Sequence, residues 1–283
     1  MLAKKTKPHF VSLAKVQDLS SISPNDLSAY TAVEYECASP EDVLKNAIQS
    51  NVKNFISSNS VTADEQKKLV QIERSEWNNL FGQPGTLFTG DFANSNVHLV
   101  EEVNVFKRGD KRETLEAIKK KLTELNINSS LITEVCIVAD EIVSNAIFNA
   151  PFVPLDNHKS GVNRKGKMLR DNITLLAKFQ LHVSEKALMI TCVDTFGRLN
   201  ISAFLKRILD CYHQGISKKM NMGEGGAGIG SHMIYNQSMA LYLAVHKEKS
   251  TCVAASFARN LSAKKRESIN KSLHIFEINE GES

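Results

Sequence analysis

The chain has 283 residues, of which 42% are hydrophobic and 23% charged, and its formal net charge is +4 at pH 7. This is an ordinary globular composition, and the length suggests about two domains. So small a net charge does not by itself indicate direct nucleic-acid binding. The cysteines are scattered and form no CxxC pair, which favours reduced thiols over a disulfide framework or a zinc site. Because no run of about 18 apolar residues is present, we expect a cytoplasmic protein without a membrane span.

Residues 1–95 are expected to form a small α/β domain of unknown type that regulates the protein or binds a partner. Two strands and two helices are predicted here, the strands at 10–16 and 32–37 and the helices from Pro40 through Ile56 and from Ala63 to Leu80. We find no chemical signature in this region. A degenerate receiver-like domain is an alternative, although the acidic cluster that would bind magnesium in a true receiver is not evident.

Residues 96–260 show a different pattern and are predicted to form a second, larger α/β domain. Its predicted strands lie at 98–106, 173–183, 187–193, 240–246 and 251–257, and its predicted helices at 113–125, 131–150, 201–212 and 232–236. Residues 261–283 are set apart as a C-terminal tail, in which residues 273–276 either form a strand or fray.

A glycine-rich run at 223–231 is the most informative stretch of this larger domain. It contains Gly226, Gly228 and Gly230, with Ile229 between the last two, and a helix-like segment follows at once. Glycine lets the backbone approach an anion closely, and the N–H groups at the start of a helix bind phosphate. The run therefore predicts a phosphate-binding loop, although a flexible linker is the alternative.

The predicted helix 131–150 carries a polar stripe. Glu141, Asn145 and Asn149 recur every four residues, so they lie on one side of the helix. An amide oxygen is a hard ligand suitable for Mg²⁺, and a carboxylate one turn away can accept a proton near a γ-phosphate. The plain alternative is a solvated polar face.

An apolar strand ends in an acid followed by a glycine at Asp194 and Gly197. The Asp194 carboxylate is suited to accept a hydrogen bond from an exocyclic amine such as that of adenine, and Gly197 would let a base approach the backbone. A plain exit from a strand into a turn is the alternative, because Asp and Gly are both common in turns.

In order and spacing, these three segments resemble the boxes of the GHKL (Bergerat-fold) ATPase family, and the chain is most similar to its anti-sigma-factor serine/threonine kinase branch. The resemblance covers about residues 96–260 and rests on an N box at 141–149, a first glycine box at 194–197 and a second at 226–230. It implies a two-layer α/β sandwich with a mixed, mostly antiparallel sheet. It also implies ATP and Mg²⁺ as cofactors.

The resemblance assigns a role to each matching residue. Glu141 would be the catalytic base, Asn145 the magnesium ligand and Asp194 the adenine contact, which Thr251 would support from the start of a later strand. The remaining residues of the three boxes would surround the nucleotide: Asn149, Gly197, Gly226, Gly228, Ile229 and Gly230.

The match departs from the family where Phe196 and Arg198 stand in place of glycines. The leading hypothesis is nevertheless an ATP-dependent kinase that phosphorylates a hydroxyl of a small antagonist protein and also binds a sigma factor. One alternative is a nucleotide-sensing module without phosphotransfer, and another is the ATPase part of a split histidine kinase. Family resemblance alone suggests a homodimer.

Overall fold

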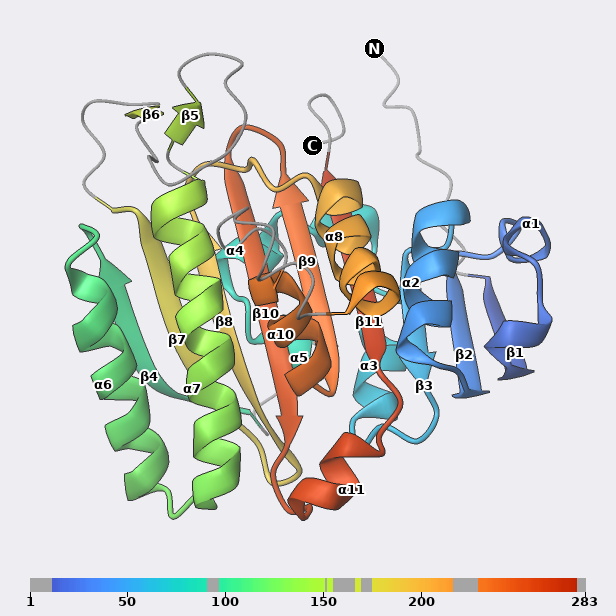
Figure 1. Ribbon diagram of the computed structural model, residues 1–283, viewed down its shortest axis with the longest axis horizontal. Helices are drawn as coiled ribbons and strands as arrows, with labels where there is room; N and C mark the ends of the chain where they lie inside the picture. The colour runs from blue at the N-terminus through green and yellow to red at the C-terminus, as the bar shows by residue number, and fades with distance from the viewer. Residues whose placement is uncertain are drawn as a thin grey trace, which may run out of the picture.

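The computed structural model describes residues 12–90, 97–150, 175–215 and 229–278 in full, and the backbone alone of 152–154 and 166–168. A mixed sheet of nine strands runs through this described part, in the order β1-β2-β3-β11-β9-β10-β8-β7-β4 (Figure 1). Its strands are β1 (Leu13–Asp18), β2 (Ala32–Cys37), β3 (Asn54–Ser57), β4 (His98–Val105), β7 (Ala177–Val183), β8 (Ala187–Asp194), β9 (Ala240–His246), β10 (Ser250–Ala258) and β11 (Ser272–Ile278). A separate hairpin joins β5 (Phe152–Pro154) to β6 (Gly166–Met168).

The direction of the strands divides the sheet. β1, β2 and β3 are parallel to one another, and β11 is parallel to β9 but antiparallel to β3. All other neighbours, from β9 across to β4, are antiparallel. The predicted α/β sandwich with a mixed, mostly antiparallel sheet is confirmed.

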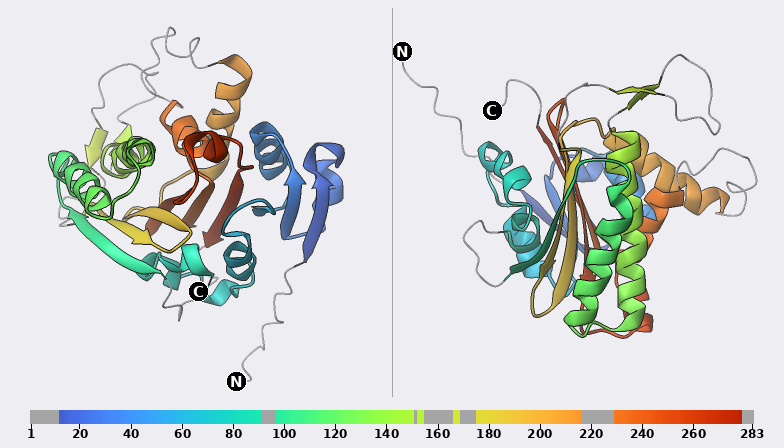
Figure 2. Two further views of the ribbon diagram at one scale, coloured as in Figure 1. Left: turned by 90° about the horizontal axis from the view of Figure 1, so that it is seen from below. Right: turned by 90° about the vertical axis from the view of Figure 1, so that its left-hand side faces the viewer.

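Helices cover both faces of the sheet (Figure 2). The helical segments are η1 (Leu19–Ser21), α1 (Pro24–Leu27), α2 (Pro40–Gln49), α3 (Ala63–Leu69), η2 (Arg74–Glu76), α4 (Asn79–Gly82), α5 (Thr86–Thr89), α6 (Asp110–Glu124), α7 (Ser129–Ser144), η3 (Asn145–Asn149), α8 (Ile201–Gln214), α10 (Ile229–Gln237) and α11 (Ala263–Glu267). The longer helices α6, α7 and α8 lie with α10 over one face, whereas the short α3, α4 and α5 lie against the other.

The main core lies between the sheet and the longer helices, and apolar residues at helical spacing contribute to it. In α7 the buried residues Leu131, Val135, Val138 and Ile142 repeat every three or four positions and so form one apolar stripe. β8 is buried almost throughout, because helices cover it on one face and residues 61–90 approach the other.

Two predicted helices in the N-terminal region are shorter than expected. The helix that begins at Pro40 ends at Gln49, and the segment expected to continue it through Ile56 forms β3, paired with β2 and β11. Pairing with neighbouring strands thus overrides the apparent helical spacing of this short apolar stretch.

The helix predicted over 63–80 is instead three short pieces, α3, η2 and α4. The rings of Trp77 and of Phe276 in β11 pack edge to face, with their centroids 5.1 Å apart. Its indole N–H donates to the carbonyl oxygen of Ile72 at 3.2 Å. Packing on β11 therefore sets the path of the chain here.

The final strand joins segments from the two ends of the sequence. β11 belongs to the segment 261–283, and it lies between β3 of the segment 1–95 and β9 of the segment 96–260. The tail region 273–276 thus forms part of a strand and does not fray. Boundaries at 95 and 260 stay predictions, and one continuous sheet runs across both of them.

Candidate functional site

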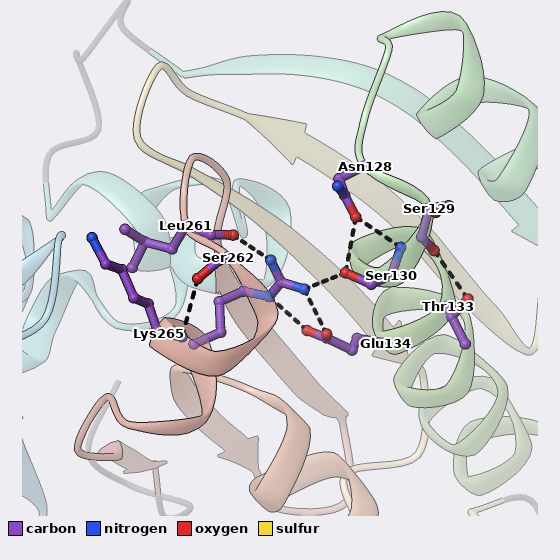
Figure 3. A network of polar contacts seen from close by, with 9 residues as sticks. Asn128, Ser129, Ser130, Thr133, Glu134, Leu261, Ser262 and Lys265 are labelled. Atoms are coloured by element: carbon purple, nitrogen blue, oxygen red, sulfur yellow. Dashed lines mark hydrogen bonds and ion pairs between the residues drawn. The ribbon is translucent and has the colours of Figure 1, made fainter.

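Helix α7, which carries the predicted N box, is capped at its N-terminal end. The Asn128 side chain accepts a hydrogen bond from the backbone N–H of Ser130 at 2.9 Å. Arg266 of α11 donates to both carboxylate oxygens of Glu134, at 2.9 and 2.6 Å, and to Ser130 Oγ at 2.8 Å (Figure 3). Only 8% of the Arg266 side chain is exposed, so these charge-assisted bonds hold the first turns of α7 in place.

Glu141 lies against the first turn of α10. A Cβ placed on Gly230 would stand 1.9 Å from Glu141 Oε2, closer than any real contact allows. Glycine at 230 is therefore required if Glu141 is to keep this position. The structure brings the predicted catalytic base directly onto the last glycine of the predicted phosphate loop.

Asn145 and Asn149 lie on a widened turn that continues α7. The N–H of Ala150 donates to the Asn145 carbonyl oxygen at 3.1 Å, an i to i+5 bond that makes η3 a π-helical turn. Asn149 Nδ2 donates to Asn145 Oδ1 at 2.8 Å. An amide oxygen has a second lone pair, so this bond leaves Oδ1 able to bind a cation. Single π turns within helices are frequent at functional sites.

Asp194 ends β8 as a buried carboxylate, with 6% of the residue exposed. Its Oδ1 accepts hydrogen bonds from the backbone N–H of Phe196 at 2.8 Å and of Gly197 at 3.3 Å. Burial raises the pKa of Asp194 to about 6, and these two N–H donors keep the pKa from rising further. Asp194 is therefore mainly ionised at pH 7 and able to accept further hydrogen bonds.

Thr251 lies directly opposite Asp194 in the ladder between β8 and β10. Its buried Oγ1 forms no hydrogen bond of ideal geometry with any described residue. It nevertheless lies near enough to Asp194 to help lower the pKa of that carboxyl group. The Thr251 hydroxyl therefore lies within reach of the Asp194 carboxylate.

Gly197 and Phe196 have structural roles beside this carboxylate. Gly197 has a φ of +62°, and a Cβ on it would stand 2.1 Å from the carbonyl oxygen of His246, at the end of β9, and 2.5 Å from the backbone nitrogen of Lys249 in the turn that follows. Phe196 is only 2% exposed and packs in the main core. Glycine is therefore needed at 197 because the backbone around this turn comes too close to leave room for a Cβ.

The three predicted segments meet through their helices and strands. α10 packs against α7, and η3 contacts β8, the strand that ends at Asp194. Ile229 and Gly230 form the first turn of α10. Gly226 and Gly228 lie outside the described residues, so the rest of the predicted phosphate loop stays a prediction.

Two further contacts near the site had no signal in the sequence. The Arg108 guanidinium lies over the Phe148 ring, 5.4 Å from its centroid. His232 of α10 lies 4.7 Å from the ring centroid of Tyr212 in α8. The His232 Nδ1 atom is buried without a hydrogen-bond partner among the described residues, and burial lowers the pKa of this histidine.

Two classes of feature are absent from the part of the chain that the structure describes. No group of three or more His, Cys, Asp or Glu side chains there is arranged to hold a metal ion. No helix of that part combines the length and the apolar character needed to cross a bilayer.

Comparisons with known proteins leave the family open. No protein-family model and no curated protein matches the chain. Among solved structures, a chain of the SiaB–SiaC complex from Pseudomonas aeruginosa is similar at a TM-score of 0.40 and 15% sequence identity, covering 56% of this chain and 90% of that one. A likeness this weak assigns neither a family nor a function.

Proposed function

We propose that this protein binds Mg-ATP in the manner of a GHKL ATPase and acts as a regulatory serine/threonine kinase on a small protein partner. The nucleotide would lie between α7 with η3, the end of β8 and the start of α10. The observation that carries the proposal is the contact of Gly230 with the Glu141 carboxylate.

The described residues fit a purine triphosphate. Asp194 is a buried, mainly ionised acceptor for an exocyclic amine, and the Thr251 hydroxyl lies beside it. An acceptor held by backbone N–H groups keeps its orientation before the ligand arrives, which favours binding.

Each remaining residue has a chemical task in this proposal. Asn145 Oδ1 would bind Mg²⁺, which neutralises phosphate charge when it is present. Ile229, Gly230 and the glycines before them would direct backbone N–H groups toward the phosphates. Glu141 would accept the proton of the attacking hydroxyl, held in place because Gly230 leaves room for its carboxylate.

The partner is proposed on the family resemblance alone. A small antagonist protein would offer the hydroxyl, and a sigma factor would bind a separate surface. A nucleotide-sensing module without phosphotransfer is the second candidate. The buried Phe196 favours it, because this core side chain stands where the family has a glycine.

The glycine contact gives a direct test by calorimetry with Mg-ATP and by measurement of ATP turnover. Gly230→Ala should displace the Glu141 carboxylate and lower ATP turnover at least about 100-fold, the scale of a lost general base. Gly82→Ala is the matched control, because a Cβ there meets nothing within 4 Å. Glu141→Ala should bind Mg-ATP while losing turnover, and the double variant should bind as Glu141→Ala does.

The outcomes separate the two candidates. Binding of Mg-ATP with no turnover by the unmodified protein supports the sensing module. Failure of the unmodified protein to bind Mg-ATP, or binding that is unchanged in Asp194→Asn, overturns the proposed nucleotide site.

A further inference from the structure

A polar cleft of about 350 Å³ lies where three parts of the chain meet. One wall comes from the start of α2, another from the end of α10, and the third from the link between α11 and β11. The lining residues are Ala38, Pro40, Asn236, Gln237 and residues 267–271. Small-molecule sites commonly have volumes upward of about 300 Å³ and occur where separate units of a fold meet.

Lys271 is the cation of this cleft, and it is buried, with 8% of the residue exposed. Its Nζ donates to the carbonyl oxygens of Asn236 at 2.8 Å and of Ser238 at 2.9 Å. Its own carbonyl oxygen accepts a hydrogen bond from the buried Tyr35 hydroxyl. The ammonium is thus held by two carbonyl oxygens at and just beyond the end of α10, and the Tyr35 hydroxyl holds the backbone of Lys271.

This ammonium makes no direct ion pair among the described residues, although the charges of Glu134 and Glu267 are close enough to raise its pKa. An ammonium has three N–H donors, and among the described residues Lys271 uses two of them, both on neutral carbonyl groups. No carboxylate of the described chain lies within ion-pair distance of it. Burial disfavours the charged form of an ammonium, and it lowers the pKa of Lys271 to about 8. Buried charges are normally paired.

The other groups of the cleft indicate which counter-ion fits. Pro40 is the first residue of the ten-residue helix α2, so the positive end of that helix faces the cleft, although Glu41 and Asp42 in its first turn offset part of this charge. Glu267 also lines the cleft, and its carboxylate disfavours a multiply charged anion such as phosphate. Side-chain amides of Asn236, Gln237 and Asn270 offer donors and acceptors for further polar groups.

We infer that this cleft binds a small organic carboxylate carrying an additional hydroxyl or amino group, with its carboxylate paired to the third N–H of Lys271. The site is separate from the proposed nucleotide site, since Gly230 and Asn236 lie near opposite ends of α10. The inference does not depend on ATP binding.

The test is isothermal titration of the full chain with sodium L-lactate and L-serine as probes, each of which carries one carboxylate and a hydroxyl group. Sodium phosphate is the rival anion, and sodium chloride matches the ionic strength. We expect saturable binding of one carboxylate probe per chain and a raised thermal midpoint. Phosphate should bind at least tenfold more weakly.

Two variants and one control locate the binding. Lys271→Met should abolish carboxylate binding. Lys264→Met removes the same charge from an exposed position of α11 outside the cleft, and it should bind like the unmodified protein. Glu267→Gln removes the repelling carboxylate from an exposed position and should tighten binding about fivefold, which keeps the test informative if Lys271→Met does not fold.

Three results would overturn the inference. The first is no saturable binding of either carboxylate, and the second is equal affinity for phosphate. The third is binding that Lys264→Met weakens as much as Lys271→Met, or that Glu267→Gln leaves unchanged.

Discussion

The two halves of the sheet are built in different ways. The antiparallel half consists of β4, β7, β8, β9 and β10, and two of its pairings join strands that follow one another directly in the chain. The parallel half consists of β1, β2 and β3, and it connects to the rest of the sheet through β11 from the far end of the sequence.

The two proposed sites lie in different parts of this divided sheet. Glu141, Asn145, Asp194 and Gly230 all belong to the antiparallel half or to the helices on it. The cleft of Lys271 lies at the boundary, between α2 of the parallel half and the end of α10. The proposed nucleotide site therefore lies within the antiparallel half. A ligand bound at Lys271 would instead contact both halves where they join.

The largest expected loss of stability comes from a substitution within the antiparallel half. Gly197→Ala should lower the free energy of unfolding by about 4 kcal/mol, because it adds a Cβ at positive φ against backbone atoms of the β9–β10 turn. Gly215→Ala is the matched control, since its φ is +75° but a Cβ there meets nothing within 4 Å. Urea denaturation of both variants measures the difference. Equal losses would show that the turn contact contributes nothing.

A smaller effect tests whether the halves unfold together. Arg266→Met leaves the partly buried Glu134, whose side chain is 20% exposed, without its partner, and it should lower the free energy of unfolding by about 3 kcal/mol. Arg112→Met, which breaks an exposed ion pair with Glu116 within α6, should cost about 0.5 kcal/mol or less.

The single tryptophan makes this measurement specific to the boundary. Trp77 packs on Phe276 of β11, so its fluorescence follows the region where the halves join, while circular dichroism follows the whole chain. Coincident transitions in Arg266→Met indicate one cooperative unit. Separate transitions would mean that the parallel half unfolds independently.

The smallest effect depends on pH. Asp194 has a folded pKa of about 6 against an ordinary value of 3.8, so between these values the unfolded chain releases a proton that the folded chain retains. Stability should therefore fall by roughly 2 kcal/mol as the pH rises from 4 to 6, and it should stay lower above pH 6. In Asp194→Asn this loss should vanish. A variant whose stability falls in parallel with that of the unmodified protein would contradict the assignment.

Much of the antiparallel half could be predicted from the sequence. The strand predicted at 240–246 has those bounds in the structure, and the one at 187–193 is one residue longer. These strands follow alternating or continuous apolar runs next to short turns, so local information is sufficient. In the parallel half the strand at 32–37 was also predicted correctly, whereas β3 was mistaken for helix because its partners come from residues 32–35 and 273–274.

For the candidate site, the sequence predicts positions on a helix face but not contacts between helices. Spacing placed Glu141 and Asn145 on one helix face, and they do lie on successive turns. The contact of Gly230 with Glu141 depends on how α10 packs on α7, which no local pattern encodes. The burial of Lys271 likewise depends on three separate segments, and a lysine is ordinarily expected at the surface.

The central position of β11 also determines when the sheet can be completed during synthesis. Synthesis proceeds from the N-terminus, so β3 emerges from the ribosome more than 200 residues before the strand that pairs with its second edge. Until then that edge exposes unpaired N–H and C=O groups to other nascent chains. Until β11 is made, the open edge of β3 is therefore a place where newly made chains can pair with one another.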